Sequence, residues 1–97
     1  MNPAIAISDR DNVATALEAL EAGRTLEIAG QRITVGVSIP RGHKIALRAI
    51  RAGEAVVKYG SPIGTATADI APGMHVHTHN VESTRGRGDR DAPRPSP

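Results

Sequence analysis

The sequence lacks cysteine, tryptophan and phenylalanine, and Tyr59 is the only Phe, Trp or Tyr residue among its 97 residues. Without cysteine the chain forms neither a disulfide nor a thiolate metal site. Its core therefore has to be built from Ile, Val, Leu and Ala. A chain of this length forms one domain at most and buries little surface. Small cores often need a further source of stability, and a histidine-bound metal or a partner surface is what the composition leaves open.

The chain also has little net charge, and that charge lies in its last residues. The formal charge is +2, and residues 84–97 hold four Arg and two Asp, which accounts for the whole excess. A neutral body with one aromatic residue lacks the basic patch and the stacking rings that nucleic-acid binding uses. No apolar run approaches the ~20 residues of a membrane helix, and the N-terminus does not have the pattern of a signal peptide. We therefore expect a cytoplasmic protein that binds neither nucleic acid nor membrane.

One helix is expected near the N-terminus. Asp9 and Asp11 are suitable N-caps for a helix over residues 12–22, and Gly23 follows where a left-handed glycine often ends a helix. The apolar residues of this segment fall at helical spacing: Val13, Leu17 and Leu20. Such a helix would pack its apolar side on a sheet and take no part in chemistry.

The rest of the body is predicted to form short strands. Residues 25–28 and 32–35 alternate apolar and polar residues around Ala29-Gly30-Gln31, which predicts a β-hairpin. Further strands are expected at residues 3–8, 44–48, 55–59 and 74–81, and no internal repeat is evident. Residues 84–97 are too polar to bury surface and are expected to be disordered. The prediction is a mainly β domain with one α-helix over residues 1–83, followed by a disordered tail.

A row of histidines in the last predicted strand is the main candidate site. His75, His77 and His79 alternate with other residues, so an extended strand places all three on one side. Neighbouring positive charges repel, which favours neutral imidazoles, and neutral imidazoles bind metals or transfer protons. A solvated outer face would carry the same row without any function. Three neighbours on one strand meet at one ion only if the strand twists or bulges, so a metal bound by two of them with a further ligand is easier.

A second candidate segment lies at residues 41–48. His43, Lys44 and Arg48 would offer cationic groups to an acidic, polyhydroxylated ligand, although an exposed turn explains them as well. The segment lacks the glycine spacing of a phosphate-binding loop, so nucleotide binding is not expected. Asn80, which follows the histidine row, could bind a substrate hydroxyl or cap a turn.

Several motifs then occur together in a known order. They are Asp11-Asn-Val-Ala-Thr-Ala-Leu17, Ile39-Pro-Arg-Gly-His-Lys-Ile-Ala-Leu47, Val57-Lys-Tyr-Gly-Ser-Pro-Ile-Gly64, Thr67-Ala-Asp-Ile70 and Val76-His-Thr-His-Asn-Val81. Residues 3–83 resemble the SAF-type domain of the altronate and galactarate dehydratase family, and also the small subunit of the related sulfolactate sulfo-lyases. The resemblance implies a compact β-clip fold of short strands.

The resemblance also implies a function. Family members eliminate water, or sulfite in the lyase branch, from sugar acids or similar 2-hydroxy acids, and use a divalent metal, commonly iron. Most of the catalytic machinery lies in a much larger partner, which would hold most of the metal site. The motifs match at several candidate residues, which we expect to face the partner's active site. The predicted catalytic residues are His43, Lys44, His77 and His79; the predicted substrate-binding residues are Arg48, Tyr59 and Asn80; the predicted metal ligands are His75, His77 and His79.

Three functions remain open from the sequence. The first is the small subunit of a lyase that dehydrates altronate, galactarate or a similar acid together with a separate large subunit. The second is a non-catalytic module that binds a sugar acid, closes a site as a lid or forms a homodimer. The third is a structural or metal-storing β-protein that uses the histidine row alone.

Overall fold

The computed structural model describes residues 3–83, and these form nine short strands in three sheets without a helix. The strands are β1 (Ala4–Ile5), β2 (Val13–Ala16), β3 (Thr25–Ile28), β4 (Gln31–Thr34), β5 (Lys44–Ala46), β6 (Ala55–Lys58), β7 (Ser61–Ala66), β8 (His75–Val76) and β9 (Val81–Ser83). The predicted disordered tail lies outside the described residues. No described segment forms a helix of the length and hydrophobicity that a membrane crossing requires.

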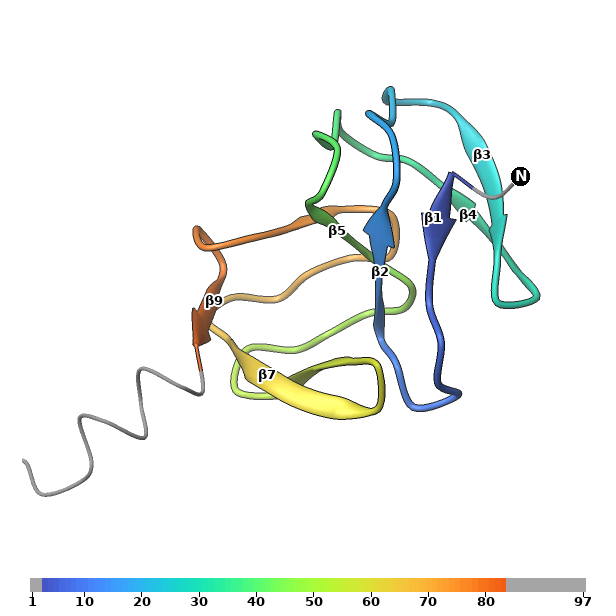
Figure 1. The fold of residues 1–97 in the computed structure, drawn as a ribbon. Helices are drawn as coiled ribbons and strands as arrows, with labels where there is room; N and C mark the ends of the chain where they lie inside the picture. Colours follow the sequence, from blue (N-terminus) through green and yellow to red (C-terminus); the bar gives the residue numbers. More distant parts are fainter. Residues whose placement is uncertain (1–2, 84–97) are drawn as a thin grey trace, which may run out of the picture.

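A four-stranded antiparallel sheet forms the centre of the molecule, in the order β1-β2-β5-β8. Two hairpins project from it (Figure 1), one made of β3 and β4 and the other of β6 and β7. The second hairpin gains a third strand, because β9 pairs with β7. The first hairpin turns at Ala29-Gly30 and the second at Tyr59-Gly60, and all four residues have positive φ angles. This geometry suits the tight two-residue turns that match the twist of paired strands.

The central sheet and the hairpins form a tandem repeat, which corrects the expectation that the chain has none. Leu20 and Ile39 exchange two backbone hydrogen bonds of 2.8 and 2.9 Å, and Ile50 and Ile70 do the same at 2.9 and 2.7 Å. Each of these four residues precedes, by three positions, a glycine of positive φ, at 23, 42, 53 and 73. The first repeat spans residues 13–42 and the second spans residues 43–73. The second is one residue longer because of a β-bulge near Ile63.

The repeat also accounts for the register of the central sheet, because the pairing of β2 with β5 recurs between β5 and β8. The pairs Ala14↔Ile45 and Thr15↔Lys44 between β2 and β5 become Lys44↔Val76 and Ile45↔His75 between β5 and β8. Each repeat thus starts with a strand of the central sheet, and β8 starts a third copy, of which the described residues contain the strand and the turn after it. Each hairpin covers its own hydrophobic cluster, one centred on Leu20 and Ile39 and the other on Ile50 and Ile70.

The predicted helix over residues 12–22 is wrong. Its first residues form β2, which lies between β1 and β5 and is buried on both faces. Val13 packs in the second hydrophobic cluster, whereas Ala14 and Ala16 pack in the first. A strand buried on both faces has a continuous apolar run, which cannot be distinguished from a buried helix by periodicity alone. The exposure of Leu17, 48%, also shows that the expected apolar stripe does not exist.

Candidate functional site

The histidine row lies partly on β8 and partly on a tight turn. The predicted strand over residues 74–81 contains only the two residues of β8 before the chain turns at 77–80 and enters β9. Asn80 fixes this turn, because its Oδ1 accepts the backbone N–H of His77 at 2.9 Å and its Nδ2 donates to the carbonyl of His75 at 2.9 Å. The turn role considered for Asn80 is therefore confirmed. The histidines converge because the chain bends, and not because they share the face of one long strand.

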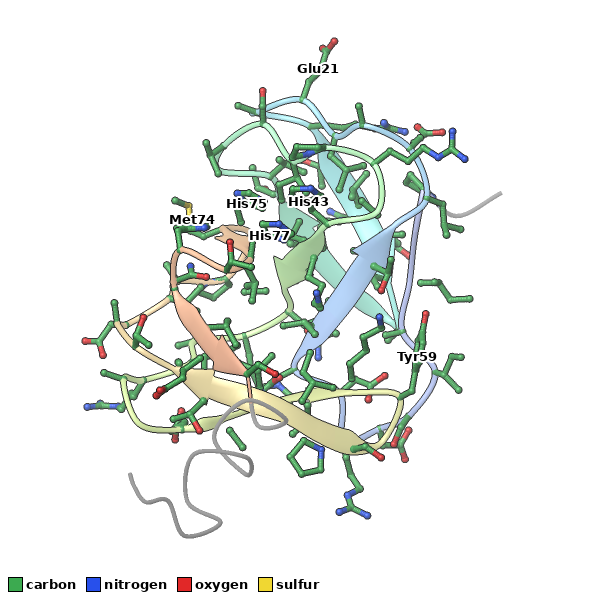
Figure 2. The ribbon with its side chains drawn as sticks, turned by 60° about the vertical axis from the view of Figure 1, so that its left-hand side comes forward. Glu21, His43, Tyr59, Met74, His75 and His77 are labelled. Carbon is green, nitrogen blue, oxygen red and sulfur yellow. The ribbon has the colours of Figure 1, made fainter. Side chains whose placement is uncertain are left out.

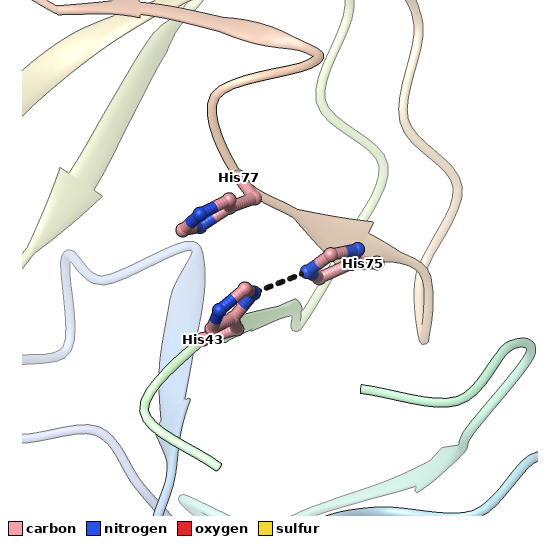
Figure 3. Close-up of side chains that lie close together, drawn as sticks. All are labelled: His43, His75 and His77. Carbon is pink, nitrogen blue, oxygen red and sulfur yellow. Dashed lines mark hydrogen bonds between the residues drawn. The ribbon is translucent and has the colours of Figure 1, made fainter. Parts of the chain in front are cut away.

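His43 joins the row from the neighbouring strand. The register Lys44↔Val76 and Ile45↔His75 brings His43, just before β5, opposite His77. The rings of His43 and His77 stack with centroids 3.7 Å apart and planes inclined by 13°. Nδ1 of His43 lies 2.8 Å from Nε2 of His75, which is a hydrogen bond whose donor depends on the tautomer. Figure 3 shows the three rings and this bond.

The cluster favours neutral imidazoles. Partial burial lowers the pKa of His75, and the neighbouring His79, His43, His77 and Lys44 lower it further. Burial is also the main cause of the lowered pKa of His77, and the charges of His43, Lys44 and His79 add to it. Both rings are therefore neutral at pH 7, where an imidazole can accept a proton or bind a metal.

The chemistry of this donor set suits a divalent transition metal. Among the described residues, one group could hold an ion, and it consists of His43, His75 and His77, whose donor nitrogens lie within 4.8 Å of one another. Imidazole nitrogen is a good ligand for iron, zinc, copper and nickel. The three rings are nearly parallel, and inclined to one another by 9–18°. An ion would therefore require at least one ring to rotate, since a ring nitrogen binds in the plane of its ring.

Lys44, the first residue of β5, lies beside the cluster and lines a small pocket. This pocket has a volume of about 210 Å³ and is lined by Lys44, Ile63, Val76, His77, Thr78, Val81 and Ser83. Burial lowers the pKa of Lys44, and the charge of Lys58 lowers it further. No ion pair joins Lys44 to an acidic side chain within residues 3–83. The pocket thus combines an ammonium group and an imidazole with mostly apolar walls, which suits one carboxylate on a small organic acid.

A family model now gives this geometry a context. The model of the altronate/galactarate dehydratase SAF domain matches residues 2–84. The chain belongs to this family. The resemblance inferred from the five sequence motifs is therefore confirmed.

The SAF domain is similar to parts of longer proteins and to a short subunit. It is 48% identical to altronate dehydratase of Escherichia coli (strain K12) over 79 residues, which are 81% of this chain and 16% of that protein. It is 45% identical to altronate dehydratase of Bacillus subtilis (strain 168) over 83 residues, which are 86% of this chain and 17% of that protein. The (2R)-sulfolactate sulfo-lyase subunit alpha of Paracoccus pantotrophus is 48% identical over 54 residues, 56% of this chain and 81% of that subunit. The chain thus spans less than a fifth of the length of either dehydratase.

The remaining predicted site residues of the SAF domain lie in two other places. His79 and Asn80 line a second pocket of about 410 Å³ together with His75, Met74, Val37, Asp69, Ile70 and Ala71. The ring of His79 lies 5.0 Å from the ring of His75 and is tilted by 36°. His79 is therefore next to the cluster without being part of the group of converging nitrogens.

Arg48 and Tyr59 do not join the histidines. Arg48 donates from Nη2 to the backbone carbonyl of Asp11 at 2.9 Å and lines a separate pocket. Tyr59 sits at the tip of the β6–β7 hairpin, with Nζ of Lys58 5.0 Å from its ring centroid. Figure 2 shows Tyr59 well away from the three labelled histidines. The predicted substrate-binding residues are therefore separated in this domain: Asn80 lies beside the histidines, whereas Arg48 and Tyr59 do not.

The local sequence pattern treated His43 separately from the histidine row, and only the family resemblance put His43, His77 and His79 in one catalytic set. His43 lies 32 residues before His75, and no local spacing connects the two. The only signal that could have linked them is the repeat, which places His43 and Met74 at equivalent positions at the start of β5 and of β8. Recognition of that equivalence would have predicted that the two strands pair.

Proposed function

We propose that this SAF domain is the small subunit of a lyase that removes water from a sugar acid such as altronate or galactarate. It would act with a separate large catalytic subunit and form one wall of the active site. The observation that carries the proposal is the histidine cluster beside Lys44, in a domain whose relatives include two altronate dehydratases and a sulfo-lyase subunit. Sulfite in place of water is the alternative leaving group.

The length of the relatives supports a partnership. The match covers 81% of the (2R)-sulfolactate sulfo-lyase subunit alpha, whose name describes one subunit of an enzyme. In the two altronate dehydratases, the region similar to this chain is accompanied by several times its own length of further protein. A SAF domain with a larger catalytic chain or domain is consistent with both arrangements.

The side chains suit an elimination beside a carboxylate. Such a reaction needs a base to remove a proton and an acid or a metal to assist the leaving group. In the proposed arrangement, the ammonium of Lys44 holds the substrate carboxylate in the 210 Å³ pocket. His77 lines the same pocket and also stacks on His43 in the histidine cluster. In the proposed arrangement, the leaving group of the bound acid departs on the side of this cluster. The base would come from the large subunit.

A divalent metal, iron by the resemblance, is the proposed cofactor. Bound to neutral imidazoles, it would supply Lewis-acid assistance to the departing hydroxyl group. The cluster offers three nitrogen ligands, and the remaining coordination positions would be filled by the large subunit, the substrate or water. The SAF domain itself contributes orientation of the carboxylate and exclusion of water around it.

The test is reconstitution with the large subunit. The two chains would be co-expressed, purified as a complex and assayed on altronate, galactarate and sulfolactate. We expect Lys44→Ala to raise KM and His77→Ala to lower kcat by roughly 100-fold. Arg32→Ala, which removes an exposed arginine of the β3–β4 hairpin, is the matched control and should leave both constants unchanged.

Two outcomes would overturn the proposal. A complex in which His77→Ala and His79→Ala together retain full activity would show that neither histidine takes part. Binding of a sugar acid by the isolated chain, with no effect of the chain on the rate of the large subunit, would instead favour a non-catalytic binding module. A homodimer that binds no large subunit would favour a dimerisation module.

A further inference from the structure

We propose that Asn80 is a positioning residue, whose side-chain amide takes the place of a further strand at the edge of β8 and so holds His75 and His77 in the cluster. The inference rests on the lyase proposal, because it concerns the rate that His77 would set. It differs from the role that the sequence predicts for Asn80, which is contact with the substrate. The two roles predict different kinetics, so an experiment can separate them.

The edge of β8 carries backbone groups that a further strand could bind. In β5, Ala46 binds the chain that leads into β8: its N–H donates to the carbonyl of Met74 at 3.0 Å, and its carbonyl accepts the N–H of Gly73 at 2.8 Å. The repeat places His77 at the position of Ala46 in the third copy. Within residues 3–83, β8 is an edge strand of the central sheet, so the backbone of His77 has no strand to bind on that side.

The side chain of Asn80 binds the groups that a strand would bind. Its Oδ1 accepts the N–H of His77 at 2.9 Å, and its Nδ2 donates to the carbonyl of His75 at 2.9 Å. The backbone N–H of Asn80 also donates to the carbonyl of His77 at 3.1 Å. A side-chain amide has an acceptor and a donor in one plane, as a peptide group has. One residue thus binds both backbone groups of His77.

The same arrangement occurs at the edge of another sheet. β6 is an edge strand of the three-stranded sheet, and there Asn12 accepts the N–H of Val57 at 2.8 Å and donates to the carbonyl of Ala55 at 2.9 Å. In both cases the amide bonds to the carbonyl of one residue and to the N–H of the residue two positions later. Asn12 lines neither of the two pockets that the histidines line. It therefore provides a control in which the same pair of bonds is lost elsewhere.

The pockets favour a positioning role over a substrate-binding one. Asn80 lines the 410 Å³ pocket, and it is not among the residues that line the 210 Å³ pocket in which Lys44 would hold the substrate carboxylate. His77 does line the smaller pocket, and its ring stacks on that of His43 with centroids 3.7 Å apart. The pairing of β5 with β2 fixes Lys44 independently of Asn80. Loss of the Asn80 amide should therefore move His77 and leave Lys44 in place.

The experiment is steady-state kinetics of the reconstituted complex. We expect Asn80→Ala to lower kcat by roughly tenfold or more and to leave KM within about twofold, because a misplacement of about 1 Å can cost about 100-fold while the carboxylate contact is retained. Asn12→Ala is the matched control, since it removes the same pair of hydrogen bonds, and it should leave both constants unchanged. A raised KM with unchanged kcat in Asn80→Ala would overturn the proposal and assign Asn80 to substrate binding.

NMR of the isolated 97-residue chain gives a readout that does not need the large subunit. At a pH where the imidazoles are neutral, Asn80→Ala should shift the ring signals of His43 and His77, because their stacking changes. Asn12→Ala should leave these signals unchanged. If Asn80→Ala does not fold, the unmodified chain decides: the amide of His77 should exchange at least roughly tenfold more slowly than an unstructured amide, and exchange at the unstructured rate would overturn the proposal.

The positioning role and the lyase role fail in different ways. Unchanged ring signals of His43 and His77 in a folded Asn80→Ala chain would overturn the positioning role, whatever the kinetics show. Shifted ring signals in the isolated chain together with an unchanged kcat of the complex would overturn the part of the histidine cluster in the lyase reaction. The placement of the rings by Asn80 would then stand without the lyase proposal.

Discussion

The first repeat, residues 13–42, and the second, residues 43–73, follow the same backbone path but differ in what surrounds them. The closing turn of the first repeat, at Gly42, faces open space, whereas that of the second, at Gly73, packs against Thr34 and Gly36 of the first. The hairpin tip of the second repeat, Tyr59-Gly60, is held by the buried carboxylate of Asp11. Within residues 3–83, no side-chain hydrogen bond holds the tip Ala29-Gly30 in this way. Docking contacts are therefore concentrated in the second repeat.

The hairpins differ for a related reason. Gly64 of β7 lies at the position that Ile33 occupies in β4. A Cβ atom at Gly64 would lie 2.6 Å from the backbone oxygen of Glu82, so the glycine is what allows β9 to approach β7. Ile33, buried at 5% exposure, fills the equivalent position of the first hairpin instead. The repeats thus differ at this position, and the glycine in place of isoleucine is what allows the second hairpin to gain a third strand.

The candidate site lies at the start of the third copy, on the edge strand of the central sheet. The fourth residue of the repeated strand is Ala16 in β2 and Ala46 in β5, both buried, and His77 follows β8 in the third copy. Among the described residues β8 is an edge strand of the central sheet, so no further strand of that sheet covers the position that His77 occupies. The candidate site therefore belongs to the start of the second repeat and to the third copy, and the first repeat contributes none of its histidines.

The largest expected difference is between the two closing glycines. Both have φ near +86°, so alanine at either position costs about 1–2 kcal/mol of backbone strain. Gly73→Ala also drives a Cβ into the carbonyl oxygen of Thr34, and we expect a total loss of about 3–5 kcal/mol. Gly42→Ala meets no atom within 4 Å and should lose only the strain. Urea unfolding followed by circular dichroism measures both, and equal losses would contradict the asymmetry.

A smaller loss is expected at Asp11, which joins the second hairpin to the loop after β1. Oδ1 accepts the N–H of Gly60 at 2.7 Å, and Oδ2 accepts the N–H groups of Ile7 and Ser8 at 3.0 and 3.1 Å. Asp11→Ala leaves these donors without their partner, and we expect a loss of about 3 kcal/mol. The same substitution should increase amide exchange at the tip of β6–β7 and leave the tip of β3–β4 unchanged.

The Asp11 contribution should also depend on pH. Burial alone would raise the pKa of its carboxyl, but the hydrogen bonds from backbone N–H groups outweigh burial and hold the pKa below 3.8. A lowered pKa in the folded state means that the stabilisation is fully present above the unfolded value and is lost as pH falls through it toward the folded pKa. Stability should therefore fall below about pH 4, and Asp11→Asn should show less of this fall. An unchanged acid limb in Asp11→Asn would assign the fall to other carboxylates.

Part of this architecture is accessible from the sequence, and the accessible part is local. The β3–β4 hairpin was predicted because its alternation and its Ala29-Gly30 turn lie within ten residues, and the structure confirms it. The repeat was missed although the sequence contains a signal for it. Residues 15–23, TALEALEAG, and residues 45–53, IALRAIRAG, are identical at five of nine positions, but the similarity outside this segment is weak. The helix over residues 12–22 was predicted because a strand buried on both faces has no alternation.

The candidate site shows the same limit. Histidine spacing pointed to residues 75–79, yet the convergence depends on strand pairing across 32 residues and on a turn formed by Asn80. The pairing of β5 with β8 follows from the whole repeat, so no short window of sequence contains it. The separation of Arg48 and Tyr59 from the cluster is likewise a property of the tertiary fold.

The next prediction, with a smaller expected loss of stability, compares two glycines that lack a positive φ: Gly36 in the first repeat and Gly64 in the second. A Cβ at Gly64 meets a backbone oxygen at 2.6 Å, whereas a Cβ at Gly36 meets the Sδ atom of Met74 at the same distance. The Met74 side chain is 37% exposed and can move, but the backbone of β9 cannot. We expect Gly64→Ala to cost about 1–3 kcal/mol and Gly36→Ala to cost less than about 1 kcal/mol. Faster amide exchange in residues 81–83 should accompany only the first variant, and its absence would show that β9 adjusts without separating from β7.

The smallest expected effect has the opposite sign. Thr15 occupies the position of Ile45 in β5 and of Val76 in β8, which are both completely buried. The hydroxyl oxygen of Thr15 is buried without a hydrogen-bond partner, and an unpaired buried hydroxyl is destabilising. Thr15→Val keeps the shape, removes the unpaired group and makes the first strand resemble the third, so we expect a gain of about 1 kcal/mol in the free energy of unfolding.

Thr15→Ser is the control for this last prediction, because it retains the hydroxyl and removes the methyl group. It should be less stable than the unmodified chain by about 1 kcal/mol, so that valine and serine lie on opposite sides of threonine in urea unfolding. A loss of stability in Thr15→Val would mean that the hydroxyl has a partner, such as an ordered water between β2 and Lys44. In that case β2 would have a hydrogen-bonded hydroxyl at the position where β5 and β8 have the apolar residues Ile45 and Val76.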